Sequence, residues 1–275
     1  MRAIDPWVNT NMLGGGPPPK WLVDVKDDYF KAGDDFLKDL SVEELLAQMD
    51  AAGVEKAVLQ VDAERPVKGV LAFTEAAPDR FFLAANLNPT RHMKSVRALE
   101  ALVTNQPVVM ARVVPFLWDL PPDHRSYYPL YTRCIDLDLP ISINTGLPGP
   151  PRPGECQRPM HLDRVCYELP ELRVCMAHGA DPWWAEAIRL LIKYANLHLM
   201  TSAYLPKYFP PELLHYMNTR GQDKILYASD HPVLAMDRCI GEAQKLDLRE
   251  GVLDKFLYQN AERVFFGERS PKLAG

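Results

Sequence analysis

Two side chains that can exchange protons follow apolar, strand-like segments late in the chain. His178 comes directly after the segment that ends at Ala177, and Asp230 comes directly after Ser229. Burial at the mouth of an apolar scaffold would raise the pKa of Asp230 toward the range of a general base. A histidine on the same rim could act as a general acid or polarise a carbonyl. We therefore expect Asp230 and His178 to be the catalytic pair.

Other residues at the ends of strand-like segments have side chains suited to binding a substrate. Arg112 could hold a substrate carboxylate through two parallel N–H groups, or could pair with an aspartate on the same rim. Asn9 and Asn144 would offer amide N–H donors to an oxyanion. The full set of substrate-binding candidates is Arg112, Asn9, Asn144, Trp7, Asp5 and His231.

A scaffold must bring these distant residues together. Eight mostly apolar segments alternate with stretches of helical spacing, which indicates a parallel sheet covered by helices. Right-handed crossovers repeated along the chain close such a sheet into a barrel with the strand ends around one mouth. We predict an α/β fold, a distorted (β/α)8 TIM barrel with long active-site loops. The expected strands lie in 1–10, 56–61, 81–86, 108–114, 140–144, 172–177, 197–201 and 224–229.

Local signals support this alternation. Ser41 and Glu44 form a capping box at the start of a predicted helix, and Gly53 stands where a left-handed C-cap belongs. The segment 9–28 is predicted to be a long loop, and we expect its part 14–21, together with the Gly/Pro-rich loop 148–160, to cover the mouth. An open, doubly wound sheet is the alternative, but no Gly-x-Gly-x-x-Gly follows the first strand.

Composition excludes several classes of protein. The 275 residues suit one barrel domain over 1–275, and the interspersed net charge of −5 argues against nucleic acid as a partner. No run approaches the roughly 18 apolar residues that cross a membrane. The five cysteines are odd in number and form no Cys-x-x-Cys pair, which is typical of reduced thiols in a cytoplasmic protein. We expect a small-molecule substrate.

Short motifs on the predicted strands, taken in order, resemble a known family. They are ISINTG at 141–146, MAHG at 176–179, YASDHP at 227–232 and, on the last helix, NAERVF at 260–265. The pattern is similar to the amidohydrolase superfamily, in the amidohydrolase-related branch that contains decarboxylases of the aminocarboxymuconate-semialdehyde type. The resemblance implies the barrel fold, and it implies a possible homodimer, because barrels of this family are often dimers.

The resemblance also implies a metal site that this sequence has altered. In the family the first strand ends Asp-x-His-x-His, and a later strand ends His-x-Gly; here Trp7, Asn9 and Asn144 stand at the three ligand positions. The histidine that contacts water or substrate is kept as His178, and the aspartate that binds metal and accepts a proton is kept as Asp230. Indole cannot ligate, and amides are poor zinc ligands. We therefore expect no cofactor; zinc held with help from His231 and Asp5 is the alternative.

Three functions fit these features. The first is a metal-independent enzyme that hydrolyses an activated lactone, ester or similar small carboxylated or aromatic substrate, with Asp230 as base and His178 as acid or polariser. The second is a non-oxidative decarboxylase, in which Arg112 and His178 hold the carboxylate and protonate the carbanion. The third is a barrel without activity that serves as a binding or partner subunit.

Overall fold

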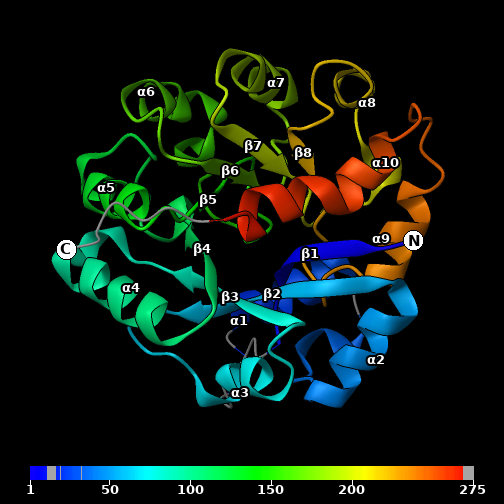
Figure 1. Cartoon of the computed structure of the whole chain (residues 1–275), viewed down its shortest axis with the longest axis horizontal. Coiled ribbons are helices and arrows are strands. Elements are labelled where there is room, and N and C mark those ends of the chain that lie inside the picture. Colours follow the sequence, from blue (N-terminus) through cyan, green and yellow to red (C-terminus); the bar gives the residue numbers. More distant parts are fainter. Residues whose placement is uncertain (11–16, 19, 32, 269–275) are drawn as a thin grey trace.

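The computed structural model describes residues 1–10, 17–18, 20–31 and 33–268, and its strands form one parallel sheet of eight in the order β1 to β8. Figure 1 shows the strands at the centre with the helices around them. The predicted TIM barrel is therefore confirmed. The strands are β1 (Ala3–Val8), β2 (Val54–Asp62), β3 (Phe81–Asn86), β4 (Val108–Val113), β5 (Ile141–Asn144), β6 (Val174–Ala177), β7 (Leu197–Met200) and β8 (Ile225–Leu226).

The last strand is much shorter than the predicted segment 224–229, because the chain turns toward β1. Ser229 donates its backbone N–H to the Asp5 carboxylate, and Asp230 donates its own to the Trp7 carbonyl at 3.1 Å. One residue further on, Val8 and His231 form a parallel bridge. The barrel closes through these contacts, and the same contacts set the position of Asp230.

The helices follow the strands as expected from the alternation. The capping box is confirmed: the Ser41 side chain accepts from the Glu44 N–H at 3.1 Å, and the Glu44 carboxylate accepts from the Ser41 N–H at 2.9 Å. Gly53 ends that helix with φ 74°. The α-helices are α1 (Lys20–Asp24), α2 (Val42–Ala52), α3 (Lys68–Ala76), α4 (Met93–Asn105), α5 (Tyr128–Asp136), α6 (Leu162–Glu168), α7 (Trp184–Lys193), α8 (Pro211–Met217), α9 (Met236–Ala243) and α10 (Val252–Asp254).

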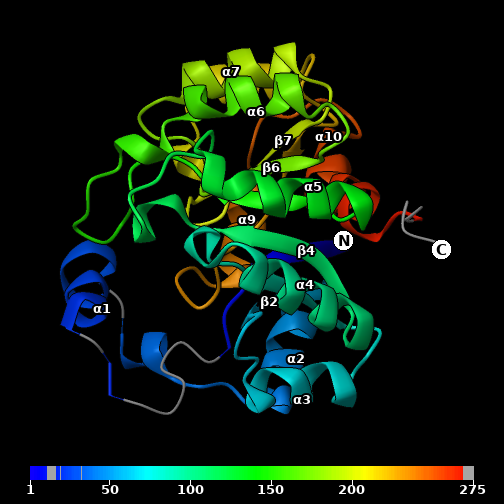
Figure 2. The same cartoon turned by 90° about the vertical axis from the view of Figure 1, so that its left-hand side faces the viewer.

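Part of the predicted loop 9–28 is helical. Helix α1 continues into a π-helical turn, η1 (Val25–Phe30), and its apolar residues Leu22 and Val25 are buried. Figure 2 shows α1 at one end of the barrel, away from both chain termini. Residues 11–16 of the same segment lie outside the described part. In the described residues no helix is long and apolar enough to cross a membrane.

A C-terminal helical segment closes the other end of the barrel. Its π-helical turns, η9 (Lys255–Gln259) and η10 (Glu262–Phe266), place Val264 and Phe265 in the same apolar cluster as Val58 and Met110 of the strands. In Figure 1 this segment, orange to red, passes across the strands. The interior of the barrel is therefore filled by side chains from the strands and from this segment.

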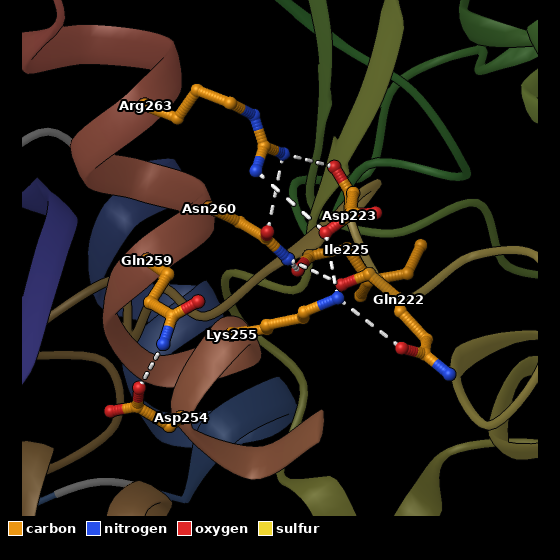
Figure 3. A network of polar contacts seen from close by, with 8 residues as sticks. All are labelled: Gln222, Asp223, Ile225, Asp254, Lys255, Gln259, Asn260 and Arg263. Carbon is orange, nitrogen blue, oxygen red and sulfur yellow. Dashed lines mark hydrogen bonds and ion pairs between the residues drawn. The ribbon is translucent and has the colours of Figure 1, made fainter. Parts of the chain in front are cut away.

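Asn260 fixes the C-terminal segment to the start of β8. Its side-chain amide donates at 2.8 Å to the carbonyls of Gln222 and Ile225, and its oxygen accepts from Arg263 at 3.2 Å (Figure 3). Arg263 also donates to the Asp223 carbonyl. Asn260 is fully buried and its bond to the Ile225 carbonyl is buried, so no water can replace the donor at that carbonyl.

Replacing Asn260 by alanine should destabilise the fold markedly. The change leaves two carbonyls at the start of β8 without their donor, and we expect the free energy of unfolding to fall by about 2 to 4 kcal/mol. Urea unfolding followed by circular dichroism measures this quantity. Gln259→Ala is the control, because Gln259 is exposed and its amide donates to the side chain of Asp254. Equal stability of the two variants would contradict the role given to Asn260.

His198 makes the fold sensitive to acid. It lies buried in β7, where burial and then the charges of Lys224 and Arg263 lower its pKa to about 3. The folded protein therefore holds the neutral ring, whereas the unfolded chain takes up a proton below about pH 6.5. Stability from this residue is complete above pH 6.5 and is lost as the pH falls toward 3.

The variant His198→Gln should therefore lose stability less steeply in acid. Between pH 6 and 4 one protonating histidine changes the free energy of unfolding by up to about 1.4 kcal/mol per pH unit. Urea unfolding at several pH values should give a smaller slope for the variant than for the wild type. His215→Gln is the matched control, because His215 lies exposed on α8. Parallel pH curves for wild type and His198→Gln would exclude this contribution.

Candidate active site

A cavity of about 630 Å³ opens at the carboxyl ends of the strands. Every strand places a residue in its wall, either at the strand's end or shortly after it. Active sites of such barrels lie at this face, so the cavity is the candidate active site. These residues, in strand order, are Asn9, Asp62, Asn86, Arg112, Asn144, His178, Ala203 and Asp230.

Asp230 is held in the wall by its neighbours on β1. Asn9 donates its side-chain amide to Asp230 Oδ1 at 3.0 Å and to the His231 carbonyl at 3.2 Å. Burial raises the pKa of Asp230 to about 7, although the charge of Arg112 and then the Asn9 hydrogen bond oppose the shift. Protonated and ionised forms of Asp230 are thus both populated near neutral pH, and it can give or take a proton.

Trp7 contacts both Arg112 and His178, two residues of the cavity wall. Arg112 Cζ lies 3.5 Å from the centroid of a Trp7 ring, and Trp7 meets the His178 ring edge to face at 4.5 Å between centroids. Among the described residues no carboxylate forms an ion pair with Arg112. The pKa of Arg112, lowered to about 9 by burial, still leaves it charged at neutral pH. Its guanidinium is therefore fixed in place and free to bind an anion.

His178 is uncharged in this setting. Burial, and then the nearby Arg112 charge, lower the pKa of His178 to about 3. A neutral imidazole can polarise a substrate oxygen through an N–H group, but it carries no extra proton to release at neutral pH. Of the two roles expected for His178, the physical chemistry favours polariser over general acid.

Both proposed catalytic residues have a strained backbone. His178 has φ 66° and Asp230 has φ 65°, in the left-handed region that costs energy for a residue with a side chain. The His178 N–H is held by Ser202 Oγ at 3.0 Å, and that of Asp230 by the Trp7 carbonyl. Such strain gathers at functional sites, where surrounding contacts keep a side chain aimed at one place.

Three of the expected substrate-binding residues do not line the cavity described here. Trp7 is fully buried beneath Arg112. Asp5 accepts hydrogen bonds from the Trp7 N–H and from the N–H and hydroxyl of Ser229, and burial raises its pKa to about 6. His231 is buried and accepts the Asn9 N–H through its carbonyl at 2.8 Å. We expected these side chains to touch substrate, but the contacts between β1 and the end of β8 occupy Asp5 and the His231 backbone.

The structure adds lining residues that sequence reasoning missed. Arg65 and Arg91 stand in loops beyond β2 and β3, and the aromatic residues Phe116, Trp118 and Tyr204 line the rim. These positions follow strands by several residues, where neither periodicity nor a motif singles them out. Part of the predicted mouth loop is confirmed, because residues 147–150 also line the cavity.

The family is settled by comparison with known sequences. An amidohydrolase family model matches residues 4–267. The chain belongs to the amidohydrolase family. This confirms the resemblance drawn from the strand motifs and makes the protein an enzyme of that family, so the alternative of a barrel without activity is set aside. No curated protein matches the sequence closely enough to add a relative.

Solved structures resemble this amidohydrolase over nearly its whole length. An uncharacterized TIM-barrel protein from Bordetella bronchiseptica is 22% identical with TM-score 0.81, covering 96% of this chain and 98% of its own. A dihydroxybenzoic acid decarboxylase from Polaromonas, with bound manganese and the inhibitor 2-nitroresorcinol, is 18% identical with TM-score 0.67, covering 98% and 99%. A 5-carboxyvanillate decarboxylase from Novosphingobium aromaticivorans, with manganese and 4-hydroxy-3-methoxy-5-nitrobenzoic acid, is 15% identical with TM-score 0.69, covering 96% of each chain. At these identities the likeness establishes the fold.

The expectation that the amidohydrolase needs no cofactor is wrong by this comparison. Two of the neighbours hold manganese, which points to a divalent metal rather than none. Trp7, Asn9 and Asn144 stand where the family resemblance leads us to expect histidines, and zinc favours imidazole and thiolate donors. Manganese is also served by carboxylate, carbonyl and water oxygens, so the loss of histidines does not exclude it.

The residues at the cavity offer only a sparse donor set for such an ion. Across the described ranges, no group of three or more His, Cys, Asp or Glu side chains is arranged to hold a metal. Oxygen donors are available from the Asp230 carboxylate and from Asn144 Oδ1, which is buried without a hydrogen-bond partner. The charge of Arg112 opposes a second cation beside Asp230. An ion here would therefore need water or substrate for most of its ligands.

The turn that carries His178 is packed tightly against helix α7. Gly179 has φ 65°, and a Cβ built on it would lie 2.3 Å from the indole ring of Trp184. That distance is far below van der Waals contact, so either the turn or the indole must move when a side chain is added. Trp184 in turn meets Tyr204 of the cavity rim edge to face at 5.4 Å.

Gly179→Ala should therefore destabilise the amidohydrolase and displace His178. We expect the free energy of unfolding to fall by at least about 2 kcal/mol, from the clash and the left-handed backbone together. Trp184→Phe removes the contacting ring atoms, so the double variant should lose less than the sum of the single losses. A double-mutant cycle in urea unfolding measures the coupling. Additive losses would show that Trp184 does not constrain this turn.

Proposed function

We propose that this amidohydrolase is a non-oxidative decarboxylase of a hydroxylated aromatic acid. The main support for the proposal is that a fixed cation, Arg112, and a proton donor, Asp230, line the same cavity. Two of the structural neighbours give support, because they are decarboxylases of dihydroxybenzoic acid and of 5-carboxyvanillate.

Binding would rest on Arg112 and on the aromatic rim. One face of the guanidinium is stacked on Trp7, and its N–H groups point outward along its edge, which matches the geometry of a carboxylate. Phe116, Trp118 and Tyr204 offer flat apolar surfaces to an aromatic ring. The neutral His178 can donate a hydrogen bond to a phenol or carboxylate oxygen. A ring held this way has its carboxyl-bearing carbon fixed in the cavity that Asp230 lines.

Asp230 would supply the proton. In its protonated form it donates to the ring carbon that bears the carboxylate, and a hydroxyl on the ring makes that carbon electron-rich enough to accept. The carbon–carbon bond then breaks, its electron pair returns to the ring, and carbon dioxide leaves. The product carries hydrogen in place of the carboxylate, and Asp230 regains its proton from water. When bound, a divalent ion supplies positive charge to a phenolate or carboxylate oxygen.

Hydrolysis of an activated lactone or ester is the second candidate. It is favoured by the ionised fraction of Asp230 near neutral pH, since a carboxylate there could take a proton from an attacking water. His178 would polarise the carbonyl, and the buried Asn144 amide lies in the same cavity wall. The two reactions use the same residues but give different products, because only decarboxylation releases carbon dioxide.

Carbon dioxide release from a panel of hydroxybenzoates, with lactones in parallel and manganese present, should identify the reaction. We expect release from at least one hydroxybenzoate, and Asp230→Asn should lower the rate by about 10² to 10⁴, as expected for loss of a proton-transfer group. Asp79→Asn, a change at an exposed aspartate, should leave the rate unchanged. Ring opening of a lactone without carbon dioxide from any acid would replace decarboxylation by hydrolysis. Full activity of Asp230→Asn would exclude both mechanisms.

A further inference from the structure

We propose that Arg65 and Arg91 form a second anion-binding subsite in the cavity, which selects aromatic acids that carry two acidic groups. The inference rests on the proposed function in one respect, since it takes Arg112 to bind the carboxylate that reacts. It adds the class of substrate: a hydroxylated ring with a second carboxylate.

The three arginines lie on one wall of the barrel. Arg112 of β4 is paired in register with Asn86 of β3, and Asn86 with Asp62 of β2. Arg65 follows β2, and Arg91 ends the 3-10 turn η3 (Pro89–Arg91) after β3. Both therefore lie beyond the level of Arg112, toward the mouth, and all three line the same cavity.

The reacting groups come from the other side of the barrel. His178 follows β6 and Asp230 follows β8, whereas the arginines belong to β2, β3 and β4 in a closed order of eight strands. A ring that reaches Asp230 and Arg112 would thus still face Arg65 and Arg91 with its outer edge. Phe116 and Trp118 line the cavity as well and would contact the ring between its acidic groups.

The acidic residues on the arginine wall already have other partners. Asp62 accepts the backbone N–H groups of Glu64 and Arg65, at 2.8 and 3.1 Å. Glu64 pairs with Lys94 at 3.0 Å and accepts the Ser95 hydroxyl at 2.8 Å, both from helix α4. Asp62 and Glu64 thus make their hydrogen bonds and ion pair with other groups. The charge of Arg91 still acts on Glu64: against the effect of burial, Ser95, Lys94 and then Arg91 lower the pKa of Glu64.

The side chains of Arg65 and Arg91 are both exposed. Within the described ranges, neither guanidinium makes a hydrogen bond or an ion pair with a protein group. Exposed arginines are common, but these two line the same cavity as Arg112, with Asp62 and Glu64 beside them, and so place two further guanidinium groups where a substrate enters. A planar carboxylate is the anion that a guanidinium binds best, through two parallel hydrogen bonds.

Binding of matched acids tests the subsite directly. The probes are 2-hydroxybenzoate, with one carboxylate, and 2-hydroxybenzene-1,3-dicarboxylate, with two; titration calorimetry at low salt measures both. We expect the wild type to bind the diacid at least about 10-fold more tightly, the usual effect of a charge-assisted hydrogen bond. Arg65→Gln with Arg91→Gln should abolish this preference. Arg97→Gln, an exposed change on α4, should keep it.

The outcomes separate the subsite from the reaction. Equal binding of the two acids by the wild type, or a preference that survives the double change, overturns the subsite even where carbon dioxide is released from the monoacid. A preference that disappears in the double variant supports the subsite even where neither acid loses carbon dioxide, in which case the proposed reaction alone is wrong. Thermal melting of each variant checks that the fold is intact, so that a lost preference reports binding.

Discussion

The junction of β1 with the end of β8 is the constraint on which the site depends. The Asp5 carboxylate accepts hydrogen bonds from the backbone N–H and the hydroxyl of Ser229. The Trp7 carbonyl accepts a hydrogen bond from the N–H of Asp230, and the His231 carbonyl accepts one from the N–H of Asn9. These contacts complete the barrel where the ladder of β8 has already ended. They also hold Asp230 in a left-handed backbone conformation that would be unfavourable without them. The contacts that close the barrel therefore also fix the position of the Asp230 carboxyl group.

A second constraint is the burial of charge at the floor of the cavity. Burial lowers the pKa of Arg112 and of His178 and raises the pKa of Asp230. At neutral pH Arg112 nevertheless stays charged, whereas His178 is neutral. The charge of Asp230 opposes the lowering of the Arg112 pKa, and the ring face of Trp7 stabilises the guanidinium without neutralising it. A cation that keeps its charge and forms no ion pair with a carboxylate among the described residues can bind an anionic substrate. The indole of Trp7 thus supports the charge of Arg112.

The types of side chain at the site do not by themselves decide whether a metal ion binds there. Asn9 and Asn144 line the cavity and Trp7 packs against Arg112, but the expectation of no cofactor that was drawn from these three residues is wrong. Manganese in two structural neighbours points to a divalent ion, and an ion of this kind can draw its ligands from oxygen atoms and water. The sparse donors here, Asp230 and Asn144, and the nearby charge of Arg112 suggest that substrate and ion would bind together.

The sequence by itself determined the barrel, because apolar strands alternating with helices have few ways to bury their faces. It also determined the strand ends that meet at the mouth, and five of the eight expected site residues line the cavity: Asn9, Arg112, Asn144, His178 and Asp230. Only the tertiary structure decided that Asp5 and His231 serve the closure of the barrel, that Trp7 supports Arg112, and that Arg65 and Arg91 face the cavity. The reason is that a strand end fixes where the backbone arrives, whereas the partner of a side chain depends on elements far away in the sequence.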